Sequence, residues 1–292
     1  MRPSSILMLT IVVFLWGSSF VVIKLGLEEM PPTAIAFLRF LLVLPIFAII
    51  AYTRHRAIFT TAILRDWKTF VSLGLMGVTL GHVLQNVGLK FTTASNSSLI
   101  IASNPIFIAL LASMYLKERL STKQVSGMAL AFFGMSVVIM HREGFRFGSN
   151  PMGLIGDLLS LGAGISWASY TVFGKDALSR YDALMTTTSS MVYGTIFLFP
   201  IALVIEPAWG LPTSIRAWAF LLFLSYLSVG LGYLFWFKAL EDASASETGV
   251  FLFFIPIVSM STAYLILGEP VGILLALGAV MVLLGTVIVE RG

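Results

Sequence analysis

The stretch ILMLTIVVFLWGSSFVVIKLGL, residues 6–27, decides the fold. It carries one charged side chain, that of Lys24, in 22 residues. About 20 mostly apolar residues are enough for a helix to cross the hydrocarbon core of a bilayer. The stretch is too long for the apolar part of a signal peptide, and no small-residue cleavage site follows it. It predicts a retained membrane-spanning helix.

Nine further apolar runs follow, and no interval between them is long enough for a soluble domain. Backbone groups cannot stay unpaired in hydrocarbon, so these runs predict helices rather than open strands. The sequence therefore predicts an all-α membrane protein with ten transmembrane helices. The nine runs cover residues 33–52, 70–89, 97–116, 124–140, 152–174, 184–205, 217–237, 248–267 and 271–289.

The composition excludes several classes of protein. Hydrophobic residues make up 58% of the 292 residues and charged residues 11%, whereas soluble domains carry roughly 25% charged residues. There is no cysteine, and the three histidines have no metal-ligand spacing. Motifs for ATP binding, zinc proteases and serine hydrolases are also missing. We therefore expect no enzyme activity, no cofactor and no metal.

The charges between the runs predict the orientation. Twelve Lys and Arg residues fall on the side of the N-terminus and four on the other side. Because cytoplasmic loops carry the excess of positive charge, both termini are expected in the cytoplasm of a cell-membrane protein. This placement explains the net charge of +4 without a nucleic-acid partner. The four are Lys90, Arg142, Arg146 and Arg216.

An internal repeat appears when the chain is shifted by 151 residues. The shift places Trp16 on Trp167 and Lys24 on Lys175, among other matches of Trp, Pro, Gly and Glu. Shared hydrophobicity alone would not match tryptophan with tryptophan. The repeat predicts two units, residues 1–145 and 146–292, of five helices each.

An odd number of helices in each unit has a topological consequence. The second unit must enter the membrane from the opposite side, which gives an inverted repeat around a central cavity. Inverted repeats are typical of transporters, whose substrate site lies near the midplane where the repeats meet.

Two stretches carry a family resemblance. They are residues 14–20, FLWGSSF, and residues 94–121, with Ala94-Ser95, Asn104-Pro105 and Glu118 through Ser121; each recurs more weakly in the second half. The chain resembles the EamA-type ten-helix members of the drug/metabolite transporter superfamily. This resemblance implies a cavity lined by the first, third, fourth, sixth, eighth and ninth runs. It also implies that the fifth and tenth runs lie at the periphery or at a dimer contact, and that the function is export of amino acids or other metabolites.

A polar face on the third run is the first candidate for the substrate site. Its residues have the spacing i, i+3 and i+4, which puts them on one side of a helix, and their repeat mates are aromatic. A polar face opposite an aromatic face suits an amphipathic ligand, although interhelical hydrogen bonds and ordinary packing produce the same pattern. The residues are His82, Gln85 and Asn86, with the mates Tyr233, Trp236 and Phe237.

Further candidates lie near the middle of other runs. Trp16 and Trp167 lie too deep for an interfacial belt, so they either form a cavity wall, with capture of an amine by cation–π contact, or pack the repeat interface. Their neighbours Ser19 and Tyr170, and Asn104 beside a mid-run proline, join them as candidate substrate contacts.

Prolines and charged residues have other expected roles. Pro105 and Pro256 kink their helices, either as gating points or as static bends. His82 and Glu247 are the candidates for proton coupling, since intramembrane titratable groups often serve as relays. Three residues are expected to be structural. Glu118 and Glu269 would pair with basic loops or cap a neighbouring helix, and Arg39 would snorkel or pair on a helix away from the cavity.

Together these features predict a secondary transporter that exports amino acids or similar small amphipathic metabolites by alternating access and facilitated exchange. Its partners would be a small-molecule substrate and the lipid bilayer, with the chain as monomer or homodimer. The alternatives are a multidrug or quaternary-amine (choline) transporter, a proton-coupled importer, a membrane enzyme, and a scaffold without transport. The enzyme lacks a catalytic constellation, and the scaffold lacks soluble domains or long interaction loops.

Overall fold

The computed structural model describes residues 1–56, 63–117, 120–143, 151–206, 211–270 and 272–290. Within these ranges every regular element is helical and none is a strand. The first half contains α1 (Pro3–Gly26), α2 (Pro32–Arg54), α4 (Trp67–Leu73), a π-helical segment η1 (Gly74–Leu80), α5 (Gly81–Phe91), α6 (Ala94–Ile101), α7 (Asn104–Leu111), a π-helical segment η2 (Ala112–Leu116) and α8 (Thr122–Glu143).

The second half has a similar order. It contains α9 (Pro151–Ala177), α10 (Ala183–Ile205), α11 (Ile215–Leu222), a π-helical segment η3 (Phe223–Leu231), α12 (Gly232–Asp242), α13 (Ala245–Gly249), a 3₁₀ segment η4 (Val250–Phe254), α14 (Ile255–Leu267) and α15 (Ile273–Glu290). The order differs in that η4 precedes α14, whereas η2 follows α7. The π-helical segments η1 and η3 lie at equivalent places in the two halves.

Local sequence fixes several helix starts. Asp182 Oδ1 accepts a hydrogen bond from the Met185 N–H at 2.8 Å, and Thr93 Oγ1 accepts one from the Asn96 N–H at 3.1 Å. These side chains satisfy backbone donors that have no partner inside the first helical turn. Pro3 and Pro32 occupy first-turn positions, where the missing N–H of proline costs nothing.

Among the described residues, seven helical stretches are long and apolar enough to cross a membrane. Large apolar side chains point outward from the bundle, among them Phe14 at 59% and Leu265 at 78% exposure. Such surfaces are stable against lipid and unfavourable in water. The chain is therefore a multi-pass membrane protein. The seven segments are Pro3–Gly26, Pro32–Arg54, Trp67–Phe91, Ala94–Leu116, Ala183–Ile205, Ile215–Asp242 and Ala245–Leu267.

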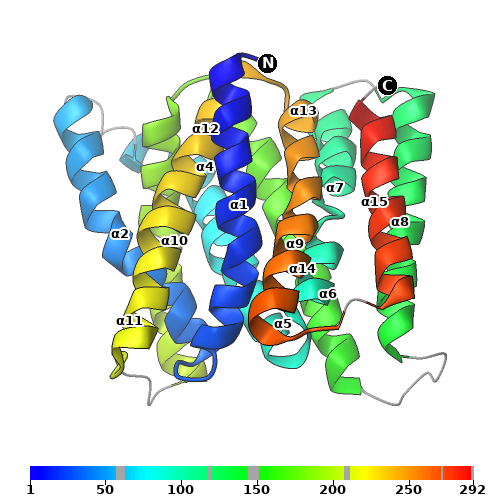
Figure 1. Cartoon of the computed structure of the whole chain (residues 1–292). Coiled ribbons are helices and arrows are strands. Elements are labelled where there is room, and N and C mark those ends of the chain that lie inside the picture. The colour runs from blue at the N-terminus through cyan, green and yellow to red at the C-terminus, as the bar shows by residue number, and fades with distance from the viewer. Residues whose placement is uncertain (57–62, 118–119, 144–150, 207–210, 271, 291–292) are drawn as a thin grey trace.

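The remaining predicted runs form α8, α9 and α15. Helices α8 and α15 lie side by side at one edge of the bundle (Figure 1). A Cβ at Gly134 would lie 2.7 Å from the Gly278 carbonyl oxygen, and a Cβ at Gly285 would lie 2.5 Å from that of Gly127. Glycine is needed at both places because backbone meets backbone. The two contacts exchange repeat mates, as a two-fold axis would require.

Each half has one lysine that joins two helices by hydrogen bonds, and the two lysines do so in the same way. Lys24 Nζ donates to the carbonyls of Leu89 and Thr92, both at 2.6 Å. Lys175 Nζ donates to the carbonyls of Leu240 and Ala243, both at 2.7 Å. All three positions in the second set are offset by 151 from those in the first. Each lysine thus caps the carboxyl end of a neighbouring helix, α5 or α12, whose last carbonyls lack partners within the helix.

Replacing Lys24 or Lys175 with methionine is expected to lower the free energy of unfolding by about 1–3 kcal/mol, because two carbonyls lose a charged donor. Methionine keeps the apolar length of the side chain. The measurement is chemical unfolding in detergent, monitored by circular dichroism. Unchanged midpoints for both variants would mean that water replaces the lysines and that the caps contribute nothing.

A carboxylate caps a third helix. Glu269 accepts hydrogen bonds from the N–H groups of Ala94 at 3.0 Å and Ser95 at 3.1 Å, and from Ser95 Oγ at 2.6 Å. A negative charge is favourable at this end of α6. Its repeat mate Glu118 lies outside the described residues.

Candidate substrate cavity

A cavity of about 70 Å³ lies where the two halves meet. Its walls come from α1, α2, η1 and α5, the end of α6 and the start of α7, α9, η3 and α12, and η4 and α14. One water molecule occupies about 30 Å³ in the liquid. The cavity in this conformation therefore has room for a few waters, and a metabolite would require it to widen.

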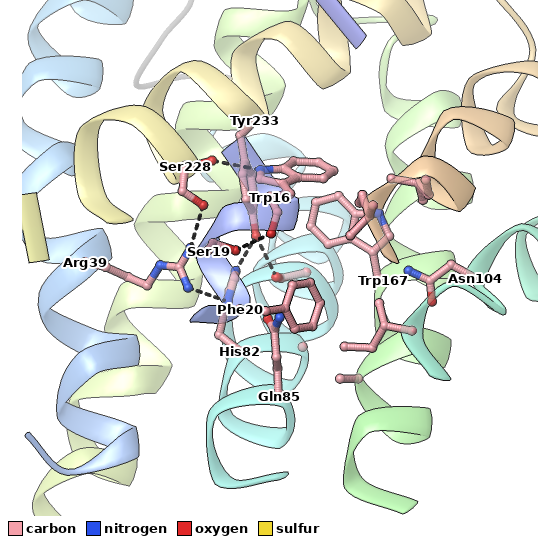
Figure 2. A pocket seen from close by; sticks show the side chains of 16 residues that line it. Trp16, Ser19, Phe20, Arg39, His82, Gln85, Asn104, Trp167, Ser228 and Tyr233 are labelled. Carbon is pink, nitrogen blue, oxygen red and sulfur yellow. Dashed lines mark hydrogen bonds between the residues drawn. The ribbon is translucent and has the colours of Figure 1, made fainter. Parts of the chain in front are cut away.

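A chain of hydrogen bonds crosses the cavity wall (Figure 2). Arg39 Nη1 lies 3.2 Å from His82 Nδ1, and His82 Nε2 lies 2.6 Å from Tyr233 Oη. Tyr233 donates in turn to the Gly77 carbonyl at 3.0 Å. A guanidinium has only donors, so His82 Nδ1 must accept and Nε2 must carry the hydrogen. The geometry thus defines a neutral His82 in one tautomer.

Two tryptophans and a tyrosine form the aromatic wall of the cavity. The ring centroids of Trp16 and Trp167 lie 4.8 Å apart, edge to face, and that of Tyr233 lies 5.2 Å from Trp167. Trp16 Nε1 donates to the Ser228 carbonyl at 2.9 Å. Trp16 and Trp167 are only partly buried, and both line the cavity.

Three predicted aromatic contacts lie behind this wall. Trp236, Phe237 and Tyr170 are fully buried and do not line the cavity. Trp236 packs 5.4 Å from Trp16, and Phe237 packs 5.2 Å from Tyr170. They support the wall instead of facing the cavity.

The residues of the predicted polar face lie in two different surroundings. His82 and Gln85 line the cavity, whereas Asn86 Nδ2 donates to the Pro32 carbonyl at 3.0 Å and thus joins α5 to α2. Ser19 also lines the cavity, with its hydroxyl donating to the Trp16 carbonyl at 2.7 Å.

The fourth predicted run is interrupted just before its proline, and the ninth passes through a 3₁₀ segment just before its proline. Helix α6 ends at Ile101 and α7 restarts at Asn104, with Pro105 in its first turn; Pro256 is placed likewise in α14. Asn104 lines the cavity at the first break. Among the described residues, the buried atoms Asn104 Oδ1 and Trp167 Nε1 have no hydrogen-bond partner.

The remaining charged candidates differ in position. Glu247 is exposed and accepts from the Ser244 N–H at 2.9 Å, which forms a capping box at the start of α13. It does not line the cavity.

The expected position of Arg39 away from the cavity is wrong: its side chain is 2% exposed and lines the cavity. The rotation of α2 turns this residue inward. A single charged residue within an apolar run usually faces the bundle interior, and this was the sequence feature that could have indicated its position.

Replacing Gly232 with alanine is expected to lower the free energy of unfolding by about 1–3 kcal/mol, because the new Cβ would overpack the aromatic wall. That Cβ would lie 2.4 Å from Trp16 Nε1. The internal repeat supplies the control. A Cβ at its mate Gly81 would meet only the Met76 carbonyl, at 3.1 Å, so Gly81→Ala should be close to neutral. Thermal unfolding in detergent distinguishes the two, and equal midpoints would contradict the close approach of Trp16.

The fold is that of a multi-pass membrane protein with a cavity between its two halves. The sequence matches the EamA-like transporter family twice, over residues 3–140 and 154–291. The chain belongs to this family of membrane transporters, within the drug/metabolite transporter superfamily.

Several curated proteins resemble the whole chain. A protein of Archaeoglobus fulgidus named as an uncharacterized transporter is 32% identical, with 98% of each chain covered. A probable terminal-alkyne amino-acid exporter of Streptantibioticus cattleyicolor is 28% identical, covering 97% of this chain and 92% of its own. A probable amino-acid metabolite efflux pump of Escherichia coli is 29% identical, covering 97% and 93%. A crystal structure with a TM-score of 0.72 and 18% identity covers 99% of this chain and 96% of its own, and it shares the fold.

Proposed function

We propose that this chain exports small amphipathic metabolites, amino acids above all, by alternating access. The observation that carries the proposal is the cavity between the halves, whose wall combines aromatic side chains with polar ones, among them Arg39, His82 and Gln85. Small-molecule sites have this mixture of apolar walls and a few placed polar groups. The names of the Streptantibioticus and Escherichia relatives support amino acids as the substrate class.

The proposal includes ten membrane-spanning helices in two inverted units, residues 1–145 and 146–292. The matched lysine caps and the reciprocal glycine contacts of α8 and α15 support it. Two similar units that face opposite ways can exchange conformations, which converts an inward-open cavity into an outward-open one. Pro105, after the interruption between α6 and α7, and Pro256, after the 3₁₀ segment η4, are the proposed bending points. The monomer and a homodimer both fit this arrangement.

Transport down the substrate gradient, as facilitated exchange, is the proposed energetics. His82 is engaged by Arg39 and Tyr233, and Glu247 is exposed in a helix cap. Neither arrangement favours a proton relay between the two faces. A quaternary-amine transporter is disfavoured because, among the described residues, the cavity wall has a cationic side chain and no carboxylate.

A sidedness experiment tests the proposed orientation, with both termini in the cytoplasm of the cell membrane. The natural chain has no cysteine, so single cysteines can be placed without background at the exposed positions Ser179 and Thr213. Ser179→Cys should react with an impermeant maleimide only after the cells are opened, and Thr213→Cys should react in intact cells. Labelling of both from the same face would contradict the inverted topology.

Efflux from proteoliposomes loaded in turn with radiolabelled amino acids, sugars and amines tests the function itself. We expect faster loss of one or more amino acids than from liposomes without protein. Background rates for every compound would favour a scaffold without transport.

A further inference from the structure

A buried positive charge without a negative partner is the feature of this cavity that the proposed function does not yet use. Arg39 is 2% exposed. Among the described residues no carboxylate oxygen lies within 4.0 Å of its guanidinium, although ion pairs of that length occur at the ends of the bundle. A buried charge is strongly unfavourable unless it is paired.

The present partners of Arg39 are neutral and weakly held. Nη1 contacts His82 Nδ1 and Nη2 contacts Ser228 Oγ, both at 3.2 Å. Nε has no partner among the described residues. A charge-assisted bond from a guanidinium to a carboxylate is shorter, about 2.7–2.9 Å, and often uses two parallel N–H groups. The guanidinium therefore has both the charge and the free donors for a stronger ligand.

The surroundings of Arg39 limit what that ligand can be. Its side chain and those of Trp16 and Trp167 line the same cavity, which offers an apolar body two aromatic side chains. Asn104 also lines the cavity and lies across it from Arg39 (Figure 2). A molecule with a carboxylate at one end, an apolar body and a small polar group fits these features.

We propose that Arg39 is the anion receptor of the cavity and that the substrate class is small carboxylates. In the substrate-free state its guanidinium is held by His82 and Ser228. A substrate carboxylate would take over these N–H groups as the cavity widens. This inference rests on the proposed function for its transport role, but it makes a separate claim about binding.

The test compares ligands that differ from one another in the carboxylate or in the amine. Purified full-length protein in detergent is titrated, by calorimetry, with L-leucine, with 4-methylpentanoate, which lacks the amine, and with L-leucinamide, which lacks the carboxylate. The same acid and amide pairs are then measured for valine, methionine and phenylalanine. Wild type should bind acids at least about tenfold more tightly than the matched amides, as expected for loss of a charge-assisted bidentate bond.

Variants assign the preference to Arg39. Arg39→Gln should abolish the preference for acids over amides. Arg39→Lys keeps the positive charge but lacks the paired N–H donors of the guanidinium, so it should retain the preference at weaker affinity. Arg216→Gln is the matched control, because it removes an exposed guanidinium paired with Glu28 at the bundle end, and it should bind as wild type does. Thermal unfolding of each variant verifies that it is folded. The ratio of acid to amide affinities in wild type tests the inference even if a variant fails to fold.

The inference would be overturned if wild type bound the amides as tightly as the acids, or if folded Arg39→Gln kept an unchanged preference. Absence of binding by every acid tested would also overturn it. Efflux of amines without any acid binding would leave transport standing and remove the anion receptor. Acid binding that depends on Arg39, without any flux, would support the anion receptor and contradict the transport function.

Discussion

Replacing Trp236 with alanine is expected to lower the free energy of unfolding by about 3–5 kcal/mol, the range for deleting a large aromatic side chain from a core. Trp236 is fully buried, with ring centroids 5.4 Å from Trp16 and 6.0 Å from Trp167. Its removal leaves a void directly behind the cavity wall. Because Trp236 Nε1 has no hydrogen-bond partner among the described residues, the loss comes from packing. Equilibrium unfolding in detergent measures it.

Trp67→Ala serves as the control for this substitution. Trp67 is 49% exposed near one end of the bundle, so its replacement should change stability by no more than about 0.5 kcal/mol. If both variants unfolded together with wild type, Trp236 could not be part of the packed core.

Replacing Ala163 with phenylalanine is expected to reduce transport to the level of liposomes without protein. Ala163 lies on α9, is 4% exposed and lines the cavity. A phenyl ring at this place would fill a space of about 70 Å³ and block the route to Arg39. The substitution should change the free energy of unfolding by about 1–3 kcal/mol, the usual range for overpacking, so that folded protein remains for the assay.

Ile165→Phe on the same helix is the matched control for the blocked cavity. Ile165 is 41% exposed on the outside of the bundle, where lipid accommodates a larger apolar side chain, and transport should be unchanged. Normal flux in Ala163→Phe would mean that the substrate does not pass through this cavity.

Much of the fold was predictable because hydrocarbon imposes simple rules. The apolar runs predicted where helices form, since every backbone group must be paired within its own segment. The matches of Trp16 with Trp167 and of Lys24 with Lys175 predicted equivalent positions, and the lysines make equivalent bonds. The ten-helix count and the inverted topology stay predictions.

The candidate site was less predictable because it depends on how each helix is rotated. Gln85 and Asn86 are adjacent in sequence, yet Gln85 lines the cavity and Asn86 bonds to α2. Spacing places residues on one face of a helix but does not say which neighbour that face meets. For the same reason the sequence did not predict that Arg39 lines the cavity, because the family resemblance places its helix outside the cavity lining.

Counterflow in proteoliposomes tests alternating access most directly. Vesicles are loaded with a high concentration of an unlabelled amino acid that supports efflux, and uptake of a trace of the same labelled compound is followed at equal pH on both sides. The account predicts transient accumulation of label in loaded vesicles, none in empty vesicles, and none with Ala163→Phe. Accumulation that requires a pH gradient, without any stimulation by internal substrate, would contradict the exchange mechanism.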